Sequence, residues 1–330
     1  MSTLTVSLAE AEALAAAAFQ RCETAPETAV IVARALAAAE ADGLKGHGLS
    51  RVPTYAAQAR AGKINGRAAP SLSRKSPGAL LVDAAHGFAY PAISLALKEL
   101  IPVTRAQGIA SAAIFRSHHC GAAGHHVERL AEAGLVAMMF ANSPPAIAPW
   151  GGKIPVYGTN PIAFAAPLPG RPPIVVDLSI SKAARGNILA AKQKGEAIPA
   201  GWALDIDGNP TTDAAAALAG TMLPLGDAKG TALALMVELL AAGLTGAHYA
   251  AEASSFLDAQ GPPPGTGQLI LAFDPDAFGA SPERFAVLAG MIEAQPGARL
   301  PGARRLALRA KAQRDGLPVP AALIAEINAL

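Results

Sequence analysis

Four of the seven histidines crowd into one short stretch, RSHHCGAAGHHVERL at residues 116–130, which also contains Cys120. Zinc would need three or four converging His, Cys, Asp or Glu ligands. These histidines form adjacent pairs, 118/119 and 125/126, and adjacent side chains point in different directions on a strand, loop or helix. No H-E-x-x-H or C-x-x-C spacing accompanies them. The sequence therefore predicts no metal site here.

The same stretch has the pattern of a strand–loop–helix junction. It leaves the apolar run SAAIF, passes Gly121 and Gly124 with alanines between them, and enters a helix at His125 and His126. Backbone N–H groups at a helix start, unshielded by large side chains, suit an anion such as a pyrophosphate. We therefore interpret the loop as a candidate anion or cofactor contact, while any single histidine in it fits a hydrogen-bonding role at the helix start better.

His47 lies in another setting, between two glycines and four residues before Arg51, in DGLKGHGLSRVPTY. Residues four apart share one face of a helix. Histidine can exchange a proton near neutral pH, and arginine can hold a carboxylate through two parallel hydrogen bonds. Together they could bind and protonate a small acid. Taken alone, the pair could equally be a capping histidine and a surface arginine.

Helical patterns dominate residues 1–65, and short β-type runs separated by helices follow from about residue 76. This alternation favours a parallel, doubly wound sheet. Neither G-x-G-x-x-G after a strand nor G-x-x-x-x-G-K-[ST] occurs, so the common nucleotide-binding signatures are missing.

The 330 residues carry a formal charge of +2, from 27 basic and 25 acidic side chains, which does not suggest nucleic acid. Two cysteines form no disulfide framework, and the N-terminus has no signal-peptide pattern, so we expect a cytoplasmic protein. Residues 230–247 form the longest apolar stretch, but Glu238 and several glycines interrupt it. It predicts a buried core helix and no membrane contact.

Six motifs in this order extend the picture: ADGLKGHGLSRVPTY, RSHHCGAAGHH, GTNPIAFAAP, VVDLSISKAARG, PLGDAKGTALALMVELL and LPGARR. Over residues 5–310 the set resembles the non-Rossmann malate/L-lactate dehydrogenase family. That family includes sulfolactate and ureidoglycolate dehydrogenases and the Δ1-piperideine-2-carboxylate and Δ1-pyrroline-2-carboxylate reductases. The resemblance implies an α/β fold with a largely antiparallel cofactor-binding sheet and a helical domain, in place of the doubly wound sheet.

The resemblance also implies a domain division and an assembly. A helical domain would span residues 1–75, joined by C-terminal helices at 282–330. A cofactor domain would span 76–281, with a smaller inserted subdomain around 183–220. The helical domain would help to form a homodimer.

By motif, His47 would be the proton donor, and Arg51 and Thr159 the substrate contacts. The implied cofactor contacts are His119, Cys120, Gly121, Ala122, Ala123, Asp177, Leu178, Ser179, Ala228, Lys229 and Arg304. The cofactor would be NADPH or NADH, and Lys182, Arg304 and Arg305 favour NADPH because they could meet a 2′-phosphate.

The chain departs from the family pattern at two places. Gly46 stands where a serine precedes the histidine, and Asn187 stands where an acidic residue follows ARG. Those two side chains are thought to relay protons to the histidine. Because an imine nitrogen is more basic than a carbonyl oxygen and needs less of a relay, the sequence favours reduction of a cyclic imino acid, Δ1-pyrroline-2-carboxylate or Δ1-piperideine-2-carboxylate, to proline or pipecolate. A dehydrogenase of a 2-hydroxy acid, such as malate or lactate, is the alternative, and a non-catalytic binder is a further one.

Overall fold

The computed structural model describes residues 2–330. A seven-stranded sheet lies at its centre, in the order β2-β3-β4-β11-β5-β6-β7. Only β3 and β4 pair in parallel among these strands, and all other neighbours are antiparallel. The sheet is therefore largely antiparallel, as the resemblance implied, and the expectation of a doubly wound parallel sheet is wrong. Its strands are β2 (Ser71–Ser76), β3 (Ala79–Asp83), β4 (Ile109–Ser117), β5 (Val136–Ala141), β6 (Ile162–Leu168), β7 (Arg171–Leu178) and β11 (Thr266–Phe273).

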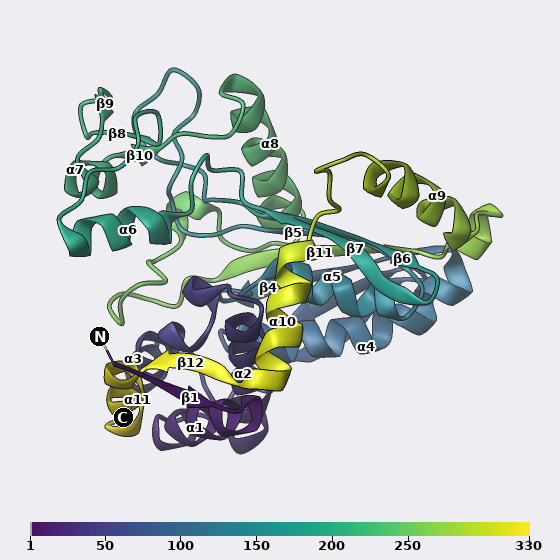
Figure 1. Ribbon diagram of the computed structural model, residues 1–330, viewed down its shortest axis with the longest axis horizontal. Helices are drawn as coiled ribbons and strands as arrows, with labels where there is room; N and C mark the ends of the chain where they lie inside the picture. The colour runs from purple at the N-terminus through teal and green to yellow at the C-terminus, as the bar shows by residue number, and fades with distance from the viewer. Residues whose placement is uncertain (1) are drawn as a thin grey trace.

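Two helices cover one face of the sheet (Figure 1). They are α4 (Ala89–Gln107) and α5 (Ala123–Glu132), which follow β3 and β4 along the chain. Their apolar side chains and those of the strands form the main core, in which Ile93, Leu130 and Ile270 are inaccessible to solvent. This core fixes the loop between β4 and α5, which is the histidine-rich stretch.

A second core lies in the helical part of the molecule, below the sheet in Figure 1. It packs α1 (Leu8–Arg21), α2 (Pro26–Ala41) and α3 (Val52–Arg60) with the C-terminal α10 (Ala303–Asp315) and α11 (Ala321–Asn328). A two-stranded sheet of β1 (Thr3–Val6) and β12 (Leu317–Pro320) joins the chain ends. By contrast, α9 (Pro282–Glu293) packs against β6 and not against these helices.

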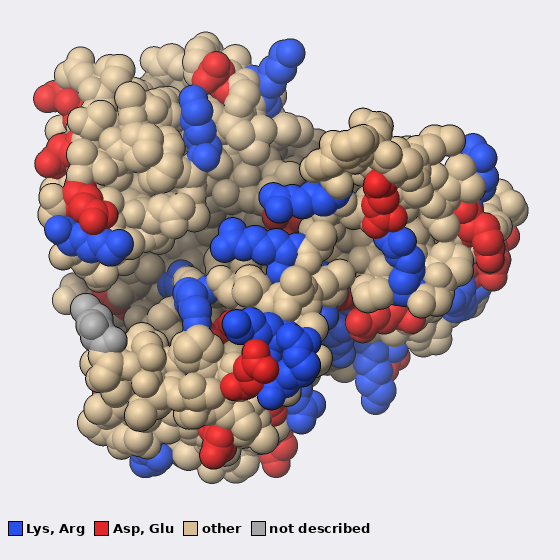
Figure 2. All heavy atoms as spheres, viewed as in Figure 1, with Lys and Arg blue, Asp and Glu red and all other residues tan. Residues whose placement is uncertain are grey.

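A third core belongs to an inserted lobe. The lobe contains α6 (Arg185–Lys194), α7 (Ala214–Ala219) and a small sheet of β8 (Ala203–Leu204), β9 (Pro210–Thr211) and β10 (Thr221–Met222). Figure 2 shows a hollow between this lobe and the helical part, with Lys and Arg side chains along its margin.

The long apolar stretch forms α8 (Ala228–Glu238), which continues as a π-helical turn, η3 (Leu239–Gly243). The prediction of a buried core helix is wrong, because only one side is covered. Val237 and Ala241 pack on the sheet, while Leu235 is 44% and Leu239 53% exposed. No helix among residues 2–330 is long and apolar enough to cross a membrane.

Candidate active site

His47 and Arg51 lie on two consecutive 3₁₀ turns, η1 (Lys45–His47) and η2 (Leu49–Arg51), that connect α2 to α3. The His47 N–H donates to the Leu44 carbonyl at 2.8 Å, and Arg51 Nε donates to the Gly46 carbonyl at 2.6 Å. The terminal guanidinium nitrogens of Arg51 have no hydrogen-bond partner among residues 2–330. The arginine is thus held by Nε, and its terminal nitrogens are free to bind another group.

Glu40 holds this turn in place, a role that the sequence did not reveal. Its buried carboxylate accepts the Leu49 N–H at 3.0 Å and pairs with Lys45. A Cβ on Gly48 would lie 2.2 Å from Glu40 Oε2. The carboxylate therefore occupies the space that only a glycine leaves open. No local pattern in the sequence marks Glu40 as buried.

The histidine-rich loop meets this turn. The rings of His47 and His119 stack with centroids 5.3 Å apart and planes 28° apart. Tyr55 from α3 hydrogen-bonds His119 Nδ1, and Phe256 packs 5.2 Å from the same ring. Tyr55 and Phe256 were also missed, because single aromatic residues in a helix and a loop have no distinctive pattern.

Burial and positive neighbours keep these imidazoles neutral. Burial, followed by the charge of Arg51, lowers the pKa of His47 to about 4. Burial and then Arg51 likewise hold the pKa of His119 well below its usual range. At neutral pH His47 is therefore uncharged and ready to accept a proton.

The rest of the loop is less open than the sequence suggested. Cys120, Ala122 and Ala123 are 4%, 8% and 1% exposed, and burial raises the pKa of the Cys120 thiol to about 12. At the start of α5, Asp177 Oδ2 accepts the Gly124 N–H at 2.7 Å. A carboxylate already bound at this helix start competes with any other anion. The structure does not favour a pyrophosphate here.

His125 and His126 have structural partners, whereas both ring nitrogens of the buried His118 have none among residues 2–330. His125 Nε2 lies 2.7 Å from Asp42 Oδ2, and His126 Nε2 lies 2.8 Å from the Cys120 carbonyl. Both occupy the first turn of α5, as predicted. In residues 2–330 no three His, Cys, Asp or Glu side chains converge as metal ligands would.

Backbone hydrogen bonds bring the remaining predicted segments together. The Ile180 N–H donates to the Thr159 carbonyl at 2.8 Å, which joins the end of β7 to the GTNP turn. The Leu225 N–H donates to the Ile180 carbonyl at 2.7 Å, which joins the start of α8 to both. The residues gathered here are Thr159, Asp177, Leu178, Ser179, Ala228 and Lys229.

The start of α8 has the features of an anion site. Asp227, at φ 55°, makes no side-chain cap there, and Ala228 and Lys229 are exposed. A Cβ on Gly230 would lie 1.8 Å from the Leu225 carbonyl, so this position requires glycine. The Lys229 N–H already donates to the Gly226 carbonyl at 3.2 Å, but the exposed Ala228 N–H beside a lysine side chain fits a phosphate of a dinucleotide.

The two arginines of LPGARR have different surroundings. Arg304 is exposed in the first turn of α10, and Gly302 before it lies close to the Val175 carbonyl of β7. Arg305 instead binds Glu128 and Asp42, each at 2.8–2.9 Å. The suggestion that Arg305 meets a 2′-phosphate is therefore wrong, because both of its terminal nitrogens already bind carboxylates. Arg304 and the exposed Lys182 keep that candidacy.

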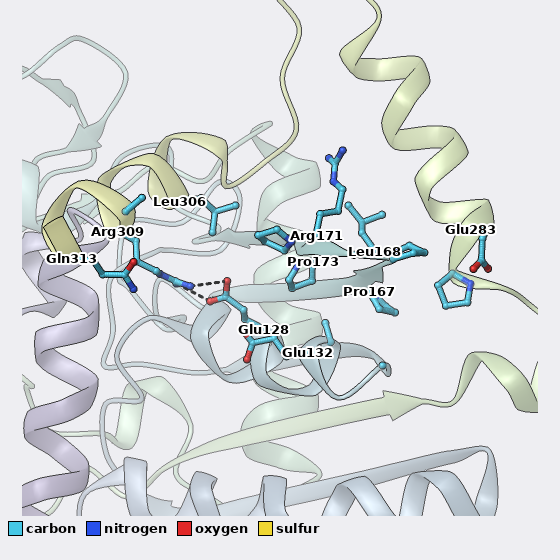
Figure 3. A pocket seen from close by; sticks show the side chains of 17 residues that line it. Glu128, Glu132, Pro167, Leu168, Arg171, Pro173, Glu283, Leu306, Arg309 and Gln313 are labelled. Atoms are coloured by element: carbon cyan, nitrogen blue, oxygen red, sulfur yellow. Dashed lines mark hydrogen bonds and ion pairs between the residues drawn. The ribbon is translucent and has the colours of Figure 1, made fainter.

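Arg305 and Arg309 form an ionic cluster with Asp42 and Glu128. Figure 3 shows Arg309 and Glu128 of this cluster beside a surface pocket of about 760 Å³. The pocket lies between α5, the β6–β7 turn and α10, and none of the predicted site residues lines it. We assign the active site to the region around His47.

Comparison with known proteins identifies the family of the chain. The family model described as malate/L-lactate dehydrogenase matches residues 6–328. The chain is 53% identical, over 98% of its length and 97% of the relative, to a (2R)-3-sulfolactate dehydrogenase (NADP+) of Chromohalobacter salexigens. It is 42% identical, over 98% of its length and 97% of the relative, to a Δ1-pyrroline-2-carboxylate reductase of Ancylobacter novellus.

A solved structure agrees with these relatives. The Δ1-piperideine-2-carboxylate reductase of Pseudomonas syringae matches with a TM-score of 0.94 at 39% identity, covering 99% of both chains. The fold is that of these malate/L-lactate dehydrogenase-type proteins. The chain belongs to the malate/L-lactate dehydrogenase family and is an oxidoreductase. The predicted resemblance is confirmed.

Proposed function

We propose that the protein transfers a hydride between NADP(H) and the carbon next to the carboxylate of a small acid. The observation that carries this proposal is the free guanidinium fork of Arg51 on the same turn as His47. The open start of α8, with Lys229, suits the dinucleotide phosphates. The exposed Arg304 and Lys182 suit a 2′-phosphate, which favours NADPH over NADH, and the relative of 53% identity is named for NADP+.

The substrate that we place first is a 2-hydroxy acid, of which (2R)-3-sulfolactate is the leading case. Arg51 binds the carboxylate, and neutral His47 takes the hydroxyl proton. The bound nicotinamide supplies the hydride acceptor. The C2–H bond breaks with its electron pair, the O–H bond loses its proton to His47, and a 2-oxo acid forms. A histidine with a pKa of about 4 suits this direction because it is unprotonated at neutral pH.

Reduction of a cyclic imino acid, which the sequence alone favoured, is the second candidate. Two observations support it. A Cβ on Gly46 would meet nothing within 4 Å, so there is room beside His47. An imine already protonated in water also needs no proton from a neutral histidine. The relatives of about 40% identity named as Δ1-pyrroline-2-carboxylate reductases keep this candidate open.

Initial rates with both pairs test the choice. We expect faster turnover of (2R)-3-sulfolactate with NADP+ than of Δ1-pyrroline-2-carboxylate with NADPH, and loss of the sulfolactate activity in His47→Ala. The reverse preference would support the imino acid, and a preference for pyruvate or oxaloacetate would keep the reaction class but replace sulfolactate by lactate or malate. Cofactor binding without turnover of any substrate would favour the non-catalytic binder.

We also propose that two copies pair through the uncovered side of α8 and η3. Leu235, Met236, Leu239 and Leu244 are between 37% and 65% exposed there, and Met138 and Leu271 of the sheet are only partly covered beside them. An apolar, uncharged helix face of this kind marks a protein interface, and a twofold axis lets it pair with itself. Leu239→Lys should yield monomers in sedimentation analysis, whereas Leu4→Lys, at another exposed leucine, should not.

A further inference from the structure

Glu238 is a buried carboxylate at the end of an otherwise apolar helix. Its exposed fraction is 3%, and no Lys, Arg or His side chain among residues 2–330 forms an ion pair with it. A buried charge without such partners is costly unless hydrogen bonds stabilise it. Its position in the helix is therefore explained only by what it binds.

Four N–H groups converge on this carboxylate. Oε1 accepts the Gly158 N–H at 3.3 Å and Asn160 Nδ2 at 2.9 Å, and Oε2 accepts the Ala250 N–H at 3.1 Å and Asn142 Nδ2 at 3.3 Å. Such charge-assisted bonds are roughly twice as strong as neutral ones. Glu238 thus ties α8 to the end of β5, the GTNP turn and η4 (Ala250–Glu252).

Two of these four donors flank Thr159 directly, on either side. Asn160 holds a left-handed conformation at φ 43°, which is uncommon for a residue other than glycine. Thr159 itself is held by Ser143, whose Oγ accepts the Thr159 N–H at 3.0 Å and lies 3.2 Å from Thr159 Oγ1. The two residues beside Thr159 are therefore held by Glu238, and its own N–H and hydroxyl are held by Ser143.

We propose that Glu238 is a positioning residue for the substrate site, which acts on Thr159 through Gly158 and Asn160. The inference rests on the proposed function, because Thr159 is a substrate contact only there. On this proposal, Glu238 accepts the hydrogen bonds that hold the GTNP turn with Asn160 in its left-handed conformation. Lys229 lies at the other end of the same helix, α8. A carboxylate at residue 238 of α8 can accept all four hydrogen bonds, which no uncharged side chain could do. This requirement explains why an acidic residue interrupts the apolar run.

A double-mutant cycle tests this assignment. Glu238→Gln keeps the shape but turns an NH₂ group toward N–H donors, and Thr159→Val removes only the hydroxyl. We expect Glu238→Gln to lower kcat/KM about tenfold to a hundredfold, the effect of losing a hydrogen bond to a charged group. The dissociation constant for NADPH, measured by fluorescence, should change less than about twofold, within the usual scatter of a remote substitution. In the Glu238→Gln background, Thr159→Val should cost little more.

Two further variants complete the design. Asn160→Gly keeps the left-handed backbone and removes the Asn160 hydrogen bonds to Glu238 and to the Ala234 carbonyl of the same helix, so it serves if Glu238→Gln does not fold. Asp213→Asn is the matched control, because Asp213 accepts the Ala216 N–H at 2.6 Å to cap α7, away from the site. It should leave kcat/KM unchanged.

The possible results separate the two proposals. Costs of Glu238→Gln and Thr159→Val that simply add would overturn the positioning role while the proposed function stands. So would an unchanged kcat/KM in both Glu238→Gln and Asn160→Gly. A wild-type protein that turns over none of the 2-hydroxy, 2-oxo or cyclic imino acids would overturn the proposed function and this inference with it.

Discussion

Gly46 and Gly48 flank His47, yet the structure predicts opposite outcomes when each is replaced by alanine. At Gly48 the new Cβ would lie 2.2 Å from Glu40 Oε2 and 3.1 Å from the Glu40 backbone. At Gly46 it would meet nothing within 4 Å. Neither glycine has a positive φ. Comparing Gly48→Ala with Gly46→Ala therefore tests the effect of the contact with Glu40.

The magnitude follows from the bond that Gly48→Ala must break. To admit the Cβ, the Glu40 carboxylate has to leave the Leu49 N–H that it accepts at 3.0 Å. A hydrogen bond to a charged group contributes about 1.5–3 kcal/mol. If the loss falls on the orientation of His47 and Arg51, kcat/KM should fall about tenfold to a hundredfold. Gly46→Ala should change it less than about twofold, since surface substitutions of this kind are usually within ±0.5 kcal/mol.

The assay is the rate of NADPH absorbance change with the best substrate of the panel, together with thermal unfolding of each variant. Glu40→Gln should behave like a milder Gly48→Ala, because an amide oxygen can still accept the Leu49 N–H but the pair with Lys45 is lost. Equal activity in Gly46→Ala and Gly48→Ala would refute the argument that Glu40 positions the turn. A large loss in both would show that the turn tolerates no side chain at all.

Three further outcomes are expected. Burial lowers the pKa of His47 and His126 to about 4 and that of His118 to about 3, so the unfolded chain binds more protons than the folded one below the usual histidine pKa of about 6.5. The contribution of these histidines to the free energy of unfolding should therefore be complete above about pH 6.5. It should fall toward pH 4, by up to ~1.4 kcal/mol per pH unit for each histidine. Urea unfolding at several pH values measures this change, and a free energy of unfolding that does not vary with pH would contradict it. Arg305→Ala should lower the free energy of unfolding by about 2–3 kcal/mol, less than a fully broken buried pair because Arg309 still binds both carboxylates. If Arg305→Ala instead raised the KM for NADPH but not for NADH, at unchanged stability, Arg305 would be a phosphate contact after all. We expect that effect on KM for Arg304→Ala. For oxidation of a 2-hydroxy acid, kcat/KM should stay level from neutral pH down to about pH 5 and decline with an apparent pKa near 4, the value that burial and Arg51 give His47 in the free enzyme; a decline beginning near pH 6.5 would contradict it.

The sequence predicted the residues that line the candidate site better than the buried residues that hold them in place. His47, Arg51 and His119 carry recognisable motifs, and the structure brings the two histidine rings together. The separate runs around Thr159, Asp177 and Ala228 also meet, through backbone bonds at Ile180 and Leu225 that no pattern announces. Glu40 and Glu238 were missed because a buried acid is recognised by the N–H groups that surround it, and those come from distant segments.

Local patterns also misled where pairing and burial are decided by the whole fold. Alternating strands and helices predicted a parallel sheet, but β11 is inserted between β4 and β5 and reverses the pairing on both sides. The apolar stretch at 230–247 predicted burial, yet composition cannot tell a core helix from one that leaves a face for a partner. Arg305 looked like a free cation because its partners, Asp42 and Glu128, lie far away in sequence.

Arg51 also offers an answer to the missing proton relay. Gly46 and Asn187 supply no acid or hydroxyl to His47, and Asn187 is exposed in the first turn of α6. On the proposed mechanism, the substrate carboxylate neutralises Arg51, which removes one of the two main causes of the low pKa of His47 and lets the ring take the hydroxyl proton. When the 2-oxo acid leaves, the charge of Arg51 is uncovered, the pKa of His47 falls again, and the proton passes to water. Substrate binding and departure would then drive the proton cycle without a fixed relay, which would let the chain dispense with the serine and the acid.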